Sequence, residues 1–373
     1  MRVLLSGGGT AGHIYPALTV ADRLRADGHE VRVIGTPNGP EARLAREAGL
    51  AFDSISARGF DRSRPLSLLV ALLQLVSSAA RSWFLLGRLR PRVVVGFGGY
   101  VSLPVGVAAI LWRIPLVLHE QNSVPGMANR ALSLWACAVG VTYEGSVRYL
   151  KPGTRAEVTG NPVREAILRA DRESGRVSLD LPADAVVVLV FGGSRGARHI
   201  NEAVVDLRGR LLADDRVHVL HVAGREEAPT VRECLERSGG DGGGRYRIID
   251  YIEDMGSAIA AADVVVARAG ATSIAEITAI GRAAILVPYP YATEDHQTLN
   301  AREVEEGGGA LLIADSDLDT DAFAEALESL LADAARRGSM SAASRRLGVP
   351  DAAVRLERLI LGCVHDRKDG DNA

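Results

Sequence analysis

The amino-acid sequence predicts an α/β protein made of two doubly wound halves, each built on a parallel β-sheet. Short runs rich in Val, Leu and Ile alternate with helical patterns along most of the chain, which is typical of parallel strands covered on both faces. A strand that ends in a glycine-rich turn and continues into a helix occurs twice, near residue 8 and near residue 193. The 373 residues are enough for two such domains.

The composition is that of a globular protein, with 47% hydrophobic and 24% charged residues. A net charge of −3 provides no basic field of the kind that binds nucleic acid, so we expect no nucleic-acid partner. Cys137, Cys234 and Cys363 are far apart, without metal-ligand spacing, which favours a reducing cytoplasm and predicts no metal centre. The sequence enters a strand at once, so we expect no cleavable leader.

The first glycine turn, residues 6–17, follows an apolar run at residues 3–5 and precedes a helical pattern at residues 18–24. Its backbone N–H groups can face an anion, and His13 stands where an imidazole could accept a proton from a nucleophile. The turn lacks the Gly-Lys-Ser/Thr of a P-loop. The next strand, residues 31–36, ends without the acidic residue of a dinucleotide fingerprint. A tight turn that only packs helix on strand is the alternative.

The rest of the first half continues the alternation of strand and helix. Further apolar runs predict strands at residues 51–56, 93–98, 114–120 and 138–142, in a parallel sheet with right-handed crossovers. The polar residues 119–122, His-Glu-Gln-Asn, stand at the end of one of these strands. Four adjacent polar residues after a buried strand predict a ligand or a domain interface that satisfies them. A helix cap by Asn122 or Ser123 would explain only part of the pattern.

One segment interrupts this rhythm. Residues 66–80 carry no charge, and arginines flank the segment at positions 58, 62, 64, 81, 88, 90 and 92. The run is shorter than the roughly 20 apolar residues that a membrane span needs. An apolar helix flanked by arginines can lie on an anionic bilayer, but a helix buried in a protein core is also apolar all round. The segment alone favours neither.

The hinge between the halves is expected at residues 161–164, Asn-Pro-Val-Arg. We therefore place one domain at residues 1–161 and the other at residues 162–349. Strands of the second domain are expected at residues 185–191, 217–222, 248–252, 263–267, 283–288 and 310–313. Residues 352–361 form an amphipathic helical pattern, and the polar tail at residues 364–373 is expected to be disordered.

Candidate ligand groups stand at strand ends of the second domain. Residues 269–273, Ala-Gly-Ala-Thr-Ser, close a strand and open a helix whose N–H groups and hydroxyls suit a diphosphate. Glu276 follows, and a carboxylate there can accept two hydrogen bonds from a vicinal diol such as a ribose. The alternative is an acidic residue that only complements the helix dipole. The polar residues 294–300 stand where open α/β folds bind ligands, or they form a solvated loop and helix cap.

Seven short motifs occur in a fixed order, at residues 7–13, 98–100, 119–122, 160–164, 192–197, 268–271 with Glu276, and 296–301. In this order they resemble the MurG family of glycosyltransferase family 28, which converts lipid I to lipid II in bacterial peptidoglycan synthesis. The resemblance runs from about residue 2 to about residue 360. The sequence departs from the family at Ala11, where many members have glycine, and at residues 288–291 and 294–295, next to the expected sugar contacts.

The resemblance implies a GT-B fold, in which two Rossmann-like domains face across a cleft and a C-terminal helix, residues 350–362, returns to the first domain. It implies that N-acetylglucosamine passes from UDP-N-acetylglucosamine to the 4-hydroxyl of the muramoyl sugar of lipid I, with inversion at the anomeric carbon. Inversion requires a base and a stabilised UDP leaving group. GT-B enzymes usually use helix N-termini for the second task, so neither a metal ion nor another cofactor is expected.

The resemblance also implies roles for residues. His13 is the preferred base and His119 the alternative. Glu276 would bind the ribose, Ile252 the uracil through its backbone, and the helix that starts near Ala271 the diphosphate. The other expected donor contacts are Thr10, Ala11, Gly12, Asn122, Arg164, Ser194, Thr272, Ser273, Ile274, Ala275 and Gln297, and the acceptor or cleft contacts are Gly99 and Tyr100.

Because the acceptor's lipid lies in the bilayer, the resemblance favours the membrane interpretation of residues 66–80. An apolar patch that includes Trp83 and Trp112 would bind anionic lipids of the inner leaflet. The protein would then be peripheral, on the cytoplasmic face of the bacterial cell membrane, with other cell-wall synthesis proteins as further partners.

Three alternatives remain open at this point. One is a related glycosyltransferase of an antibiotic pathway with another lipid-phosphate acceptor. A second is a catalytically idle, membrane-bound scaffold, which would have no need for His13, Glu276 and Gln297 together. A third is an epimerase acting on UDP-N-acetylglucosamine, which would want more acidic residues near the anomeric carbon than the first turn offers.

Overall fold

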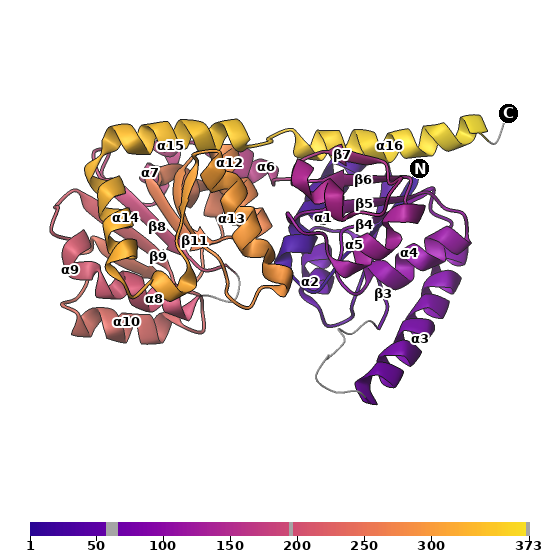
Figure 1. Ribbon diagram of the computed structural model, residues 1–373, viewed down its shortest axis with the longest axis horizontal. Coiled ribbons are helices and arrows are strands. Elements are labelled where there is room, and N and C mark those ends of the chain that lie inside the picture. Colours follow the sequence, from indigo (N-terminus) through magenta and orange to yellow (C-terminus); the bar gives the residue numbers. More distant parts are fainter. Residues whose placement is uncertain (57–65, 194–196, 371–373) are drawn as a thin grey trace. The chain divides into compact units, whose positions relative to one another are not determined.

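The computed structural model describes residues 1–56, 66–193 and 197–370 (Figure 1). The chain divides into two compact units. Unit 1 consists of Met1–Val163 and Asp351–Ala373, and unit 2 of Arg164–Pro350. Each unit contains one parallel sheet with helices on both faces, so the predicted α/β class with two doubly wound halves is confirmed.

Unit 1 is built on a seven-stranded parallel sheet with the strand order β3-β2-β1-β4-β5-β6-β7. The order reverses between β1 and β4, and open α/β sheets bind ligands at the carboxyl ends of strands beside such a point. The strands are β1 (Arg2–Ser6), β2 (Glu30–Gly35), β3 (Ala51–Ser54), β4 (Val93–Gly96), β5 (Leu116–Glu120), β6 (Ala138–Val141) and β7 (Ala156–Val158).

Alternate residues of these strands pack on opposite faces of the sheet, as the two-residue period of a strand requires. Val3 and Leu5 of β1 face the helices α1 and α16, whereas Leu4 faces α3 and α4. The helices of unit 1 are α1 (Ala11–Ala26), α2 (Pro40–Glu47), α3 (Leu66–Leu89), α4 (Ser102–Leu111), α5 (Met127–Leu132), η1 (Ser133–Trp135), η2 (Glu144–Tyr149) and α16 (Ala352–Gly370).

Unit 2 repeats this plan with a six-stranded parallel sheet in the order β10-β9-β8-β11-β12-β13. Its order reverses between β8 and β11, so the loops after these two strands meet at the edge where a ligand is expected. The strands are β8 (Val186–Phe191), β9 (Val217–Val222), β10 (Tyr246–Ile249), β11 (Val264–Arg268), β12 (Ala283–Val287) and β13 (Ala310–Leu312).

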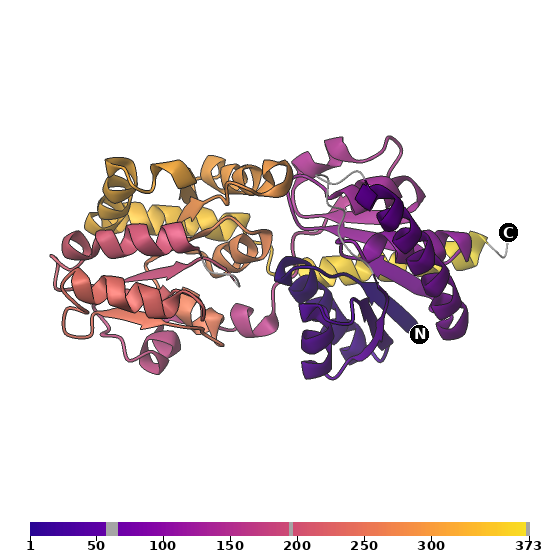
Figure 2. The ribbon, with the colours of Figure 1, turned by 90° about the horizontal axis from the view of Figure 1, so that it is seen from below.

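The helices of unit 2 cover both faces of its sheet (Figures 1 and 2). Val186, Val188 and Val190 of β8 pack on the face covered by α8, α10 and α14. The helices are α6 (Glu165–Leu168), α7 (Arg172–Ser178), α8 (Arg198–Asp206), α9 (Arg208–Leu211), α10 (Ala228–Arg237), α11 (Met255–Ala261), α12 (Ala271–Ile280), η3 (Thr293–Asp295), α13 (His296–Glu306), η4 (Asp315–Asp317), α14 (Asp321–Ala332) and α15 (Ala334–Leu347).

The C-terminal segment differs from the sequence-based expectation. We expected residues 364–373 to be disordered, but α16 continues to Gly370. Cys363 and Val364 are buried in the core on the α1 side of unit 1, so the apolar face of the helix extends beyond residue 361. This packing stabilises the helix where the sequence becomes polar.

The uncharged segment belongs to a single long helix, α3, in which Arg81 causes no break. Helix α3 packs along α4, and Leu86 and Leu89 are buried in the core beneath it. Nowhere in the described part of the chain is a helix both long enough and apolar enough to cross a membrane.

Candidate functional site

His13 lies in the first turn of α1, directly after the glycine turn that follows β1. Its Nδ1 lies 3.1 Å from the backbone oxygen of Gly8 and 3.2 Å from Oγ1 of Thr10. Because a carbonyl oxygen can only accept, the contact with Gly8 places the proton of the neutral ring on Nδ1. In this tautomer Nε2 carries the lone pair, so Nε2 is the ring nitrogen that can accept a proton.

The loop that follows β4 approaches the same ring. Gly98 and Gly99 have φ values of +93° and +77°, in the left-handed region that favours glycine. A Cβ on Gly98 would lie 3.2 Å from Cδ2 of His13, and a Cβ on Gly99 would lie 2.3 Å from the Gly8 oxygen. Glycine at both positions therefore lets the loops after β1 and β4 meet where the strand order reverses. Tyr100 follows and is exposed.

His119, the alternative base, has a different environment. It is completely buried at the end of β5, and the Gly160 oxygen lies 2.9 Å from its Nε2. Its Nδ1 accepts a hydrogen bond of 3.0 Å from Gln121 Nε2. Burial lowers the pKa of His119 to about 4, so the ring is neutral at pH 7 with both nitrogens engaged. This arrangement is typical of a structural core histidine.

Glu120, the last residue of β5, lies within the polar run at residues 119–122. One carboxylate oxygen accepts hydrogen bonds from the backbone and side-chain nitrogens of Asn122, at 3.0 and 3.3 Å. The other accepts from the Gly126 nitrogen at 3.0 Å and from Asn129 Nδ2 at 2.8 Å. The Glu120 carboxylate is therefore satisfied within unit 1, while the expectation of a ligand beside His119 and Asn122 stays a prediction. Sequence reasoning missed Asn129 because it lies in a separate helix, α5.

In unit 2, Glu276 is buried in α12 and paired with Arg164, whose Nη2 lies 2.9 Å from Oε1. Burial raises the pKa of the Glu276 carboxyl, while Arg164 acts in the opposite direction. Glu276 is the sixth residue of α12, and the first turn of this helix holds no acidic residue. A role confined to the helix dipole is therefore disfavoured, because that effect is concentrated in the first turn.

The start of α12 stands beside the point where the unit 2 strand order reverses. β11 ends at Arg268, and Gly270, which has no side chain to cap the helix, occupies the N-cap position. Thr272 and Ser273 follow in the first turn and are half-buried. A helix N-terminus with hydroxyl side chains in its first turn can bind a diphosphate.

Two other segments carry predicted residues to this edge of the sheet. Gln297 lies in the first turn of α13, and its Oε1 accepts a hydrogen bond of 2.9 Å from the Tyr289 nitrogen. Asn300, one turn later, is buried and donates to the Ala269 oxygen at 3.3 Å, which ties α13 to the turn before α12. Ile252 follows β10 in a loop and is half-buried. Ser194 lies outside the described residues.

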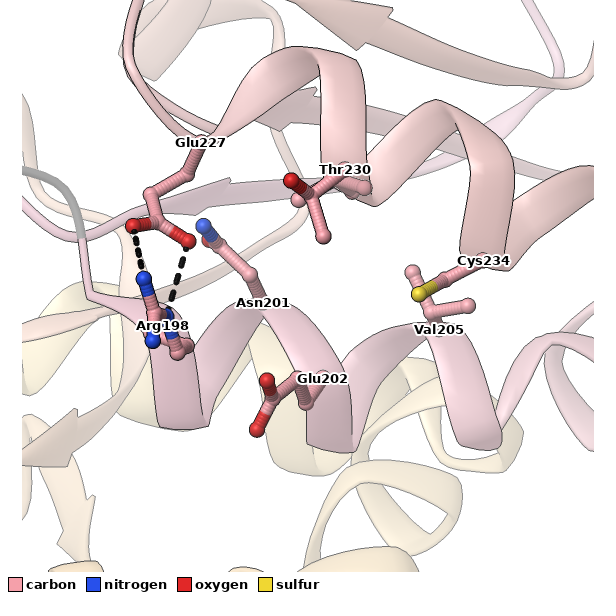
Figure 3. Close-up of a pocket in the computed structure, with 8 residues that line it drawn as sticks. Arg198, Asn201, Glu202, Val205, Glu227, Thr230 and Cys234 are labelled. Carbon is pink, nitrogen blue, oxygen red and sulfur yellow. Dashed lines mark hydrogen bonds and ion pairs between the residues drawn. The ribbon is translucent and has the colours of Figure 1, made fainter.

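A shallow groove lies elsewhere in unit 2, between α8 and α10 (Figure 3). Arg198 and Glu227 point toward one another at one end and form a bidentate ion pair, with contacts of 2.8 and 3.0 Å. None of the predicted site residues lines this groove. In the described ranges, no group of three or more His, Cys, Asp or Glu side chains is placed to hold a metal ion.

Comparisons with known proteins agree on one family. Residues 3–141 match the glycosyltransferase family 28 N-terminal domain, and residues 187–356 match the glycosyltransferase family 28 C-terminal domain. A curated relative from Halothermothrix orenii is 40% identical to this chain over 364 residues, and one from Syntrophotalea carbinolica is 41% identical over 362 residues. Each alignment covers 96% of this chain and 98% of the relative. Both relatives are named UDP-N-acetylglucosamine--N-acetylmuramyl-(pentapeptide) pyrophosphoryl-undecaprenol N-acetylglucosamine transferase.

Solved structures are similar over nearly the whole chain. The crystal structure of Acinetobacter baumannii MurG superposes with a TM-score of 0.77 at 28% identity, covering 97% of this chain and 99% of that one. The glycosyltransferase of kitacinnamycin superposes with a TM-score of 0.66 at 18% identity, covering 96% and 99%. The structure of Staphylococcus aureus MnaA with UDP superposes with a TM-score of 0.67 at 16% identity, covering 95% of this chain and 94% of that one. The last two similarities show a shared fold only.

Proposed function

The chain belongs to glycosyltransferase family 28, and we propose that it transfers N-acetylglucosamine from UDP-N-acetylglucosamine to lipid I, forming lipid II. The observation that carries this proposal is the 40–41% identity to transferases of that name over 96% of the chain. The predicted GT-B fold class is confirmed by the likeness to MurG. The antibiotic-pathway, scaffold and epimerase alternatives are not favoured, because the relatives at 40–41% identity over 96% of the chain are named as N-acetylglucosamine transferases of peptidoglycan synthesis.

Unit 2 supplies the groups that the donor requires. In this proposal Glu276 accepts hydrogen bonds from the two ribose hydroxyls, and its pairing with Arg164 fixes the carboxylate for that contact. The N–H groups at the start of α12 bind the diphosphate and stabilise the negative charge on departing UDP. Helix N–H groups act there without a metal ion.

Unit 1 supplies the base. The 4-hydroxyl oxygen of the muramoyl sugar forms a new bond to the anomeric carbon, while the bond from that carbon to the diphosphate breaks. The bonding electron pair leaves with UDP, and the hydroxyl proton passes to Nε2 of His13. The contact of Nδ1 with the Gly8 oxygen holds the tautomer that this step needs. His119 is the weaker candidate because both of its ring nitrogens already have partners within the core.

An exposed apolar surface of unit 1 supports binding to anionic lipids. Trp83 and Trp112 stack with ring centroids 4.6 Å apart, and Phe84 and Leu111 beside them in the sequence are 75% and 62% exposed. Together these four residues form the apolar patch of α3 and α4. The exposed arginines closest in sequence are Arg81, Arg88, Arg90 and Arg113, whereas positions 58, 62 and 64 lie outside the described residues.

The patch bears on the two interpretations left open for α3. One face of the helix is core, as a buried helix requires, while Trp83 and Phe84 are exposed on its surface. Exposed aromatic side chains with nearby arginines are typical of interfacial binding. We therefore propose that this patch docks the enzyme on anionic lipids at the cytoplasmic face of the membrane.

The decisive experiment is transfer of labelled N-acetylglucosamine from UDP-N-acetylglucosamine to a lipid I analogue in the presence of EDTA. We expect transfer by the wild type and by Glu328→Gln, a control in an ion pair with Arg210 that includes none of the predicted site residues, and loss of transfer by His13→Ala. Binding of the donor without transfer to lipid I would redirect the proposal to another acceptor. Absence of both binding and transfer would refute it in favour of the scaffold.

A further inference from the structure

Four charged or titratable side chains form a cluster at the carboxyl edge of the unit 2 sheet. His199, in the first turn of α8, contacts two carboxylates: its Nδ1 lies 2.8 Å from Asp315 Oδ2, and its Nε2 lies 3.0 Å from Asp319 Oδ2. The second oxygen of Asp315 pairs with Arg268, the last residue of β11. The cluster thus joins the helix after β8, the last residue of β11 and the segment after β13, which are more than 45 residues apart in sequence.

The cluster continues through Arg268 to a predicted donor contact. Arg268 Nη1 donates to the backbone oxygens of Pro288 and Val287, at 3.0 and 3.4 Å, and its guanidinium lies 5.7 Å from the centre of the Tyr289 ring. The Tyr289 nitrogen in turn donates to Gln297 Oε1. An unbroken series of side-chain and backbone contacts therefore runs from His199 to Gln297.

The geometry requires a charged histidine. A neutral imidazole has one donor and one acceptor nitrogen, so only the imidazolium can donate to carboxylates at both Nδ1 and Nε2. The hydrogen bond to Asp315 raises the pKa of His199 from its ordinary value of 6.5. Burial would raise the pKa of Asp315, but His199 and Arg268 outweigh it and the net shift is downward.

The three inner members of the cluster are shielded from solvent. The side chains of Arg268, Asp315 and His199 are 11%, 17% and 29% exposed, whereas Asp319 is 69% exposed. Among the described residues, Asp315 and Asp319 are the charged groups that face the His199 ring, and Arg268 lies beyond Asp315. Loss of the proton from His199 would leave a lone pair against a carboxylate and loosen Asp315.

We propose that His199 and Asp315 are positioning residues for the sugar of the donor, and that they act through Arg268 on residues 288–291 and on Gln297. The imidazolium holds Asp315, Asp315 holds Arg268, and Arg268 holds the segment after β12. This inference rests on the proposed function, because it takes Gln297 as a contact to the sugar nucleotide. Neither residue touches the reacting atoms, so each affects donor binding more than the chemical step.

The test compares binding of UDP-N-acetylglucosamine and of UDP by calorimetric titration, which needs no acceptor. For Asp315→Asn and His199→Gln at pH 6.5, we expect about a 10-fold loss of affinity for the sugar nucleotide, within the range that misplaced binding groups produce. UDP lacks the sugar, so its affinity should change by less than about 2-fold. Glu328→Gln, in an exposed ion pair of α14, is the control and should match the wild type for both ligands.

The pH dependence separates positioning from a merely structural role. Because the pKa of His199 is raised, its charge is present at pH 6 and is lost as the pH rises through that pKa. Wild-type affinity for UDP-N-acetylglucosamine should therefore fall between pH 6 and pH 9 by more than its affinity for UDP. His199→Arg keeps a cation at every pH in this range and should flatten the profile.

The outcomes distinguish the two proposals. If the wild type binds UDP-N-acetylglucosamine and both neutral variants bind it equally well, the positioning role is refuted and the proposed function stands. Equal losses for UDP and for the sugar nucleotide would also refute it, because the defect would then not concern the sugar. If the wild type binds neither ligand at any pH, the proposed function itself fails. Unfolding curves at pH 6.5 establish that each variant is folded.

Discussion

Replacing Gly98 by alanine would move the ring of His13 without altering its chemistry. Gly98 has a φ of +93°, and a Cβ there would lie 3.2 Å from Cδ2 and 3.3 Å from Nε2 of His13. These distances are shorter than ordinary van der Waals contact, so the ring must shift by roughly a few tenths of an ångström. If His13 is the base, this shift displaces the nitrogen that accepts the proton.

A matched control separates the effect of the new contact with His13 from the effect of backbone strain. Gly153 has a φ of +86° and nothing within 4 Å of the corresponding Cβ position, so Gly153→Ala introduces the strain without the contact. The left-handed conformation costs roughly 1–2 kcal/mol for a residue with a Cβ, and both variants should lose about that much stability. A base misplaced by ~1 Å can cost ~100-fold, so a smaller displacement in Gly98→Ala should lower kcat by ~10-fold.

The assay is initial-rate transfer to a lipid I analogue at saturating donor, together with urea unfolding of both variants. We expect Gly153→Ala to keep the wild-type kcat while Gly98→Ala loses it, with unchanged affinity for UDP. Equal kcat values for the two variants would contradict the assignment of His13, because the contact would then have no catalytic consequence.

Three further predictions concern the donor, the core and the membrane. Glu276→Gln should raise the KM for UDP-N-acetylglucosamine by roughly 10- to 100-fold, since charge-assisted hydrogen bonds contribute about 1.5–3 kcal/mol, and an unchanged KM would exclude ribose binding. The pKa of buried His119 is about 4, below its unfolded value of 6.5, so the unfolded chain binds more protons between these values. The contribution of His119 to the free energy of unfolding, measured in urea, should therefore fall by about 3 kcal/mol as the pH is lowered from 7 to 4. A free energy of unfolding that does not change over this range would contradict the burial of His119 as a neutral ring. Phe84→Ser should weaken binding to anionic vesicles by about 10-fold, since a buried aromatic side chain contributes roughly 1.5–3 kcal/mol. Val177 in α7 is as exposed as Phe84, and Val177→Ser should leave vesicle binding unchanged. Equal losses of vesicle binding in the two variants would argue against a localised patch.

Much of the fold is predictable because its signals are local. Val186 to Phe191 reads as a buried strand without knowledge of its neighbours, and the glycine turns after β1 and β8 mark the change from strand to helix. The end of α16 is not local in this sense. Its last turns are polar in sequence, and the helix continues because Cys363 and Val364 find buried positions in unit 1.

The candidate site shows the same division. His13 and His119 both stand beside strand ends in the sequence, and nothing near either residue reveals which is buried. The packing against Gly160 and Gln121 makes His119 a core residue, whereas the loop after β4 brings Gly98 to the ring of His13. In the polar run at residues 119–122, Glu120 finds its partners in Asn122, Gly126 and Asn129, and the last two lie beyond the run in sequence.

The sequence by itself determined the α/β class, the two glycine turns and the ordered motifs that resemble family 28, because each depends on residues close together in the chain. Only the tertiary structure decided which histidine is buried and which face of α3 is exposed. It alone brought His199 against Asp315 across 116 residues. The physical reason is that burial and charge pairing depend on strand order and helix packing, which place distant segments side by side and leave no trace in local composition.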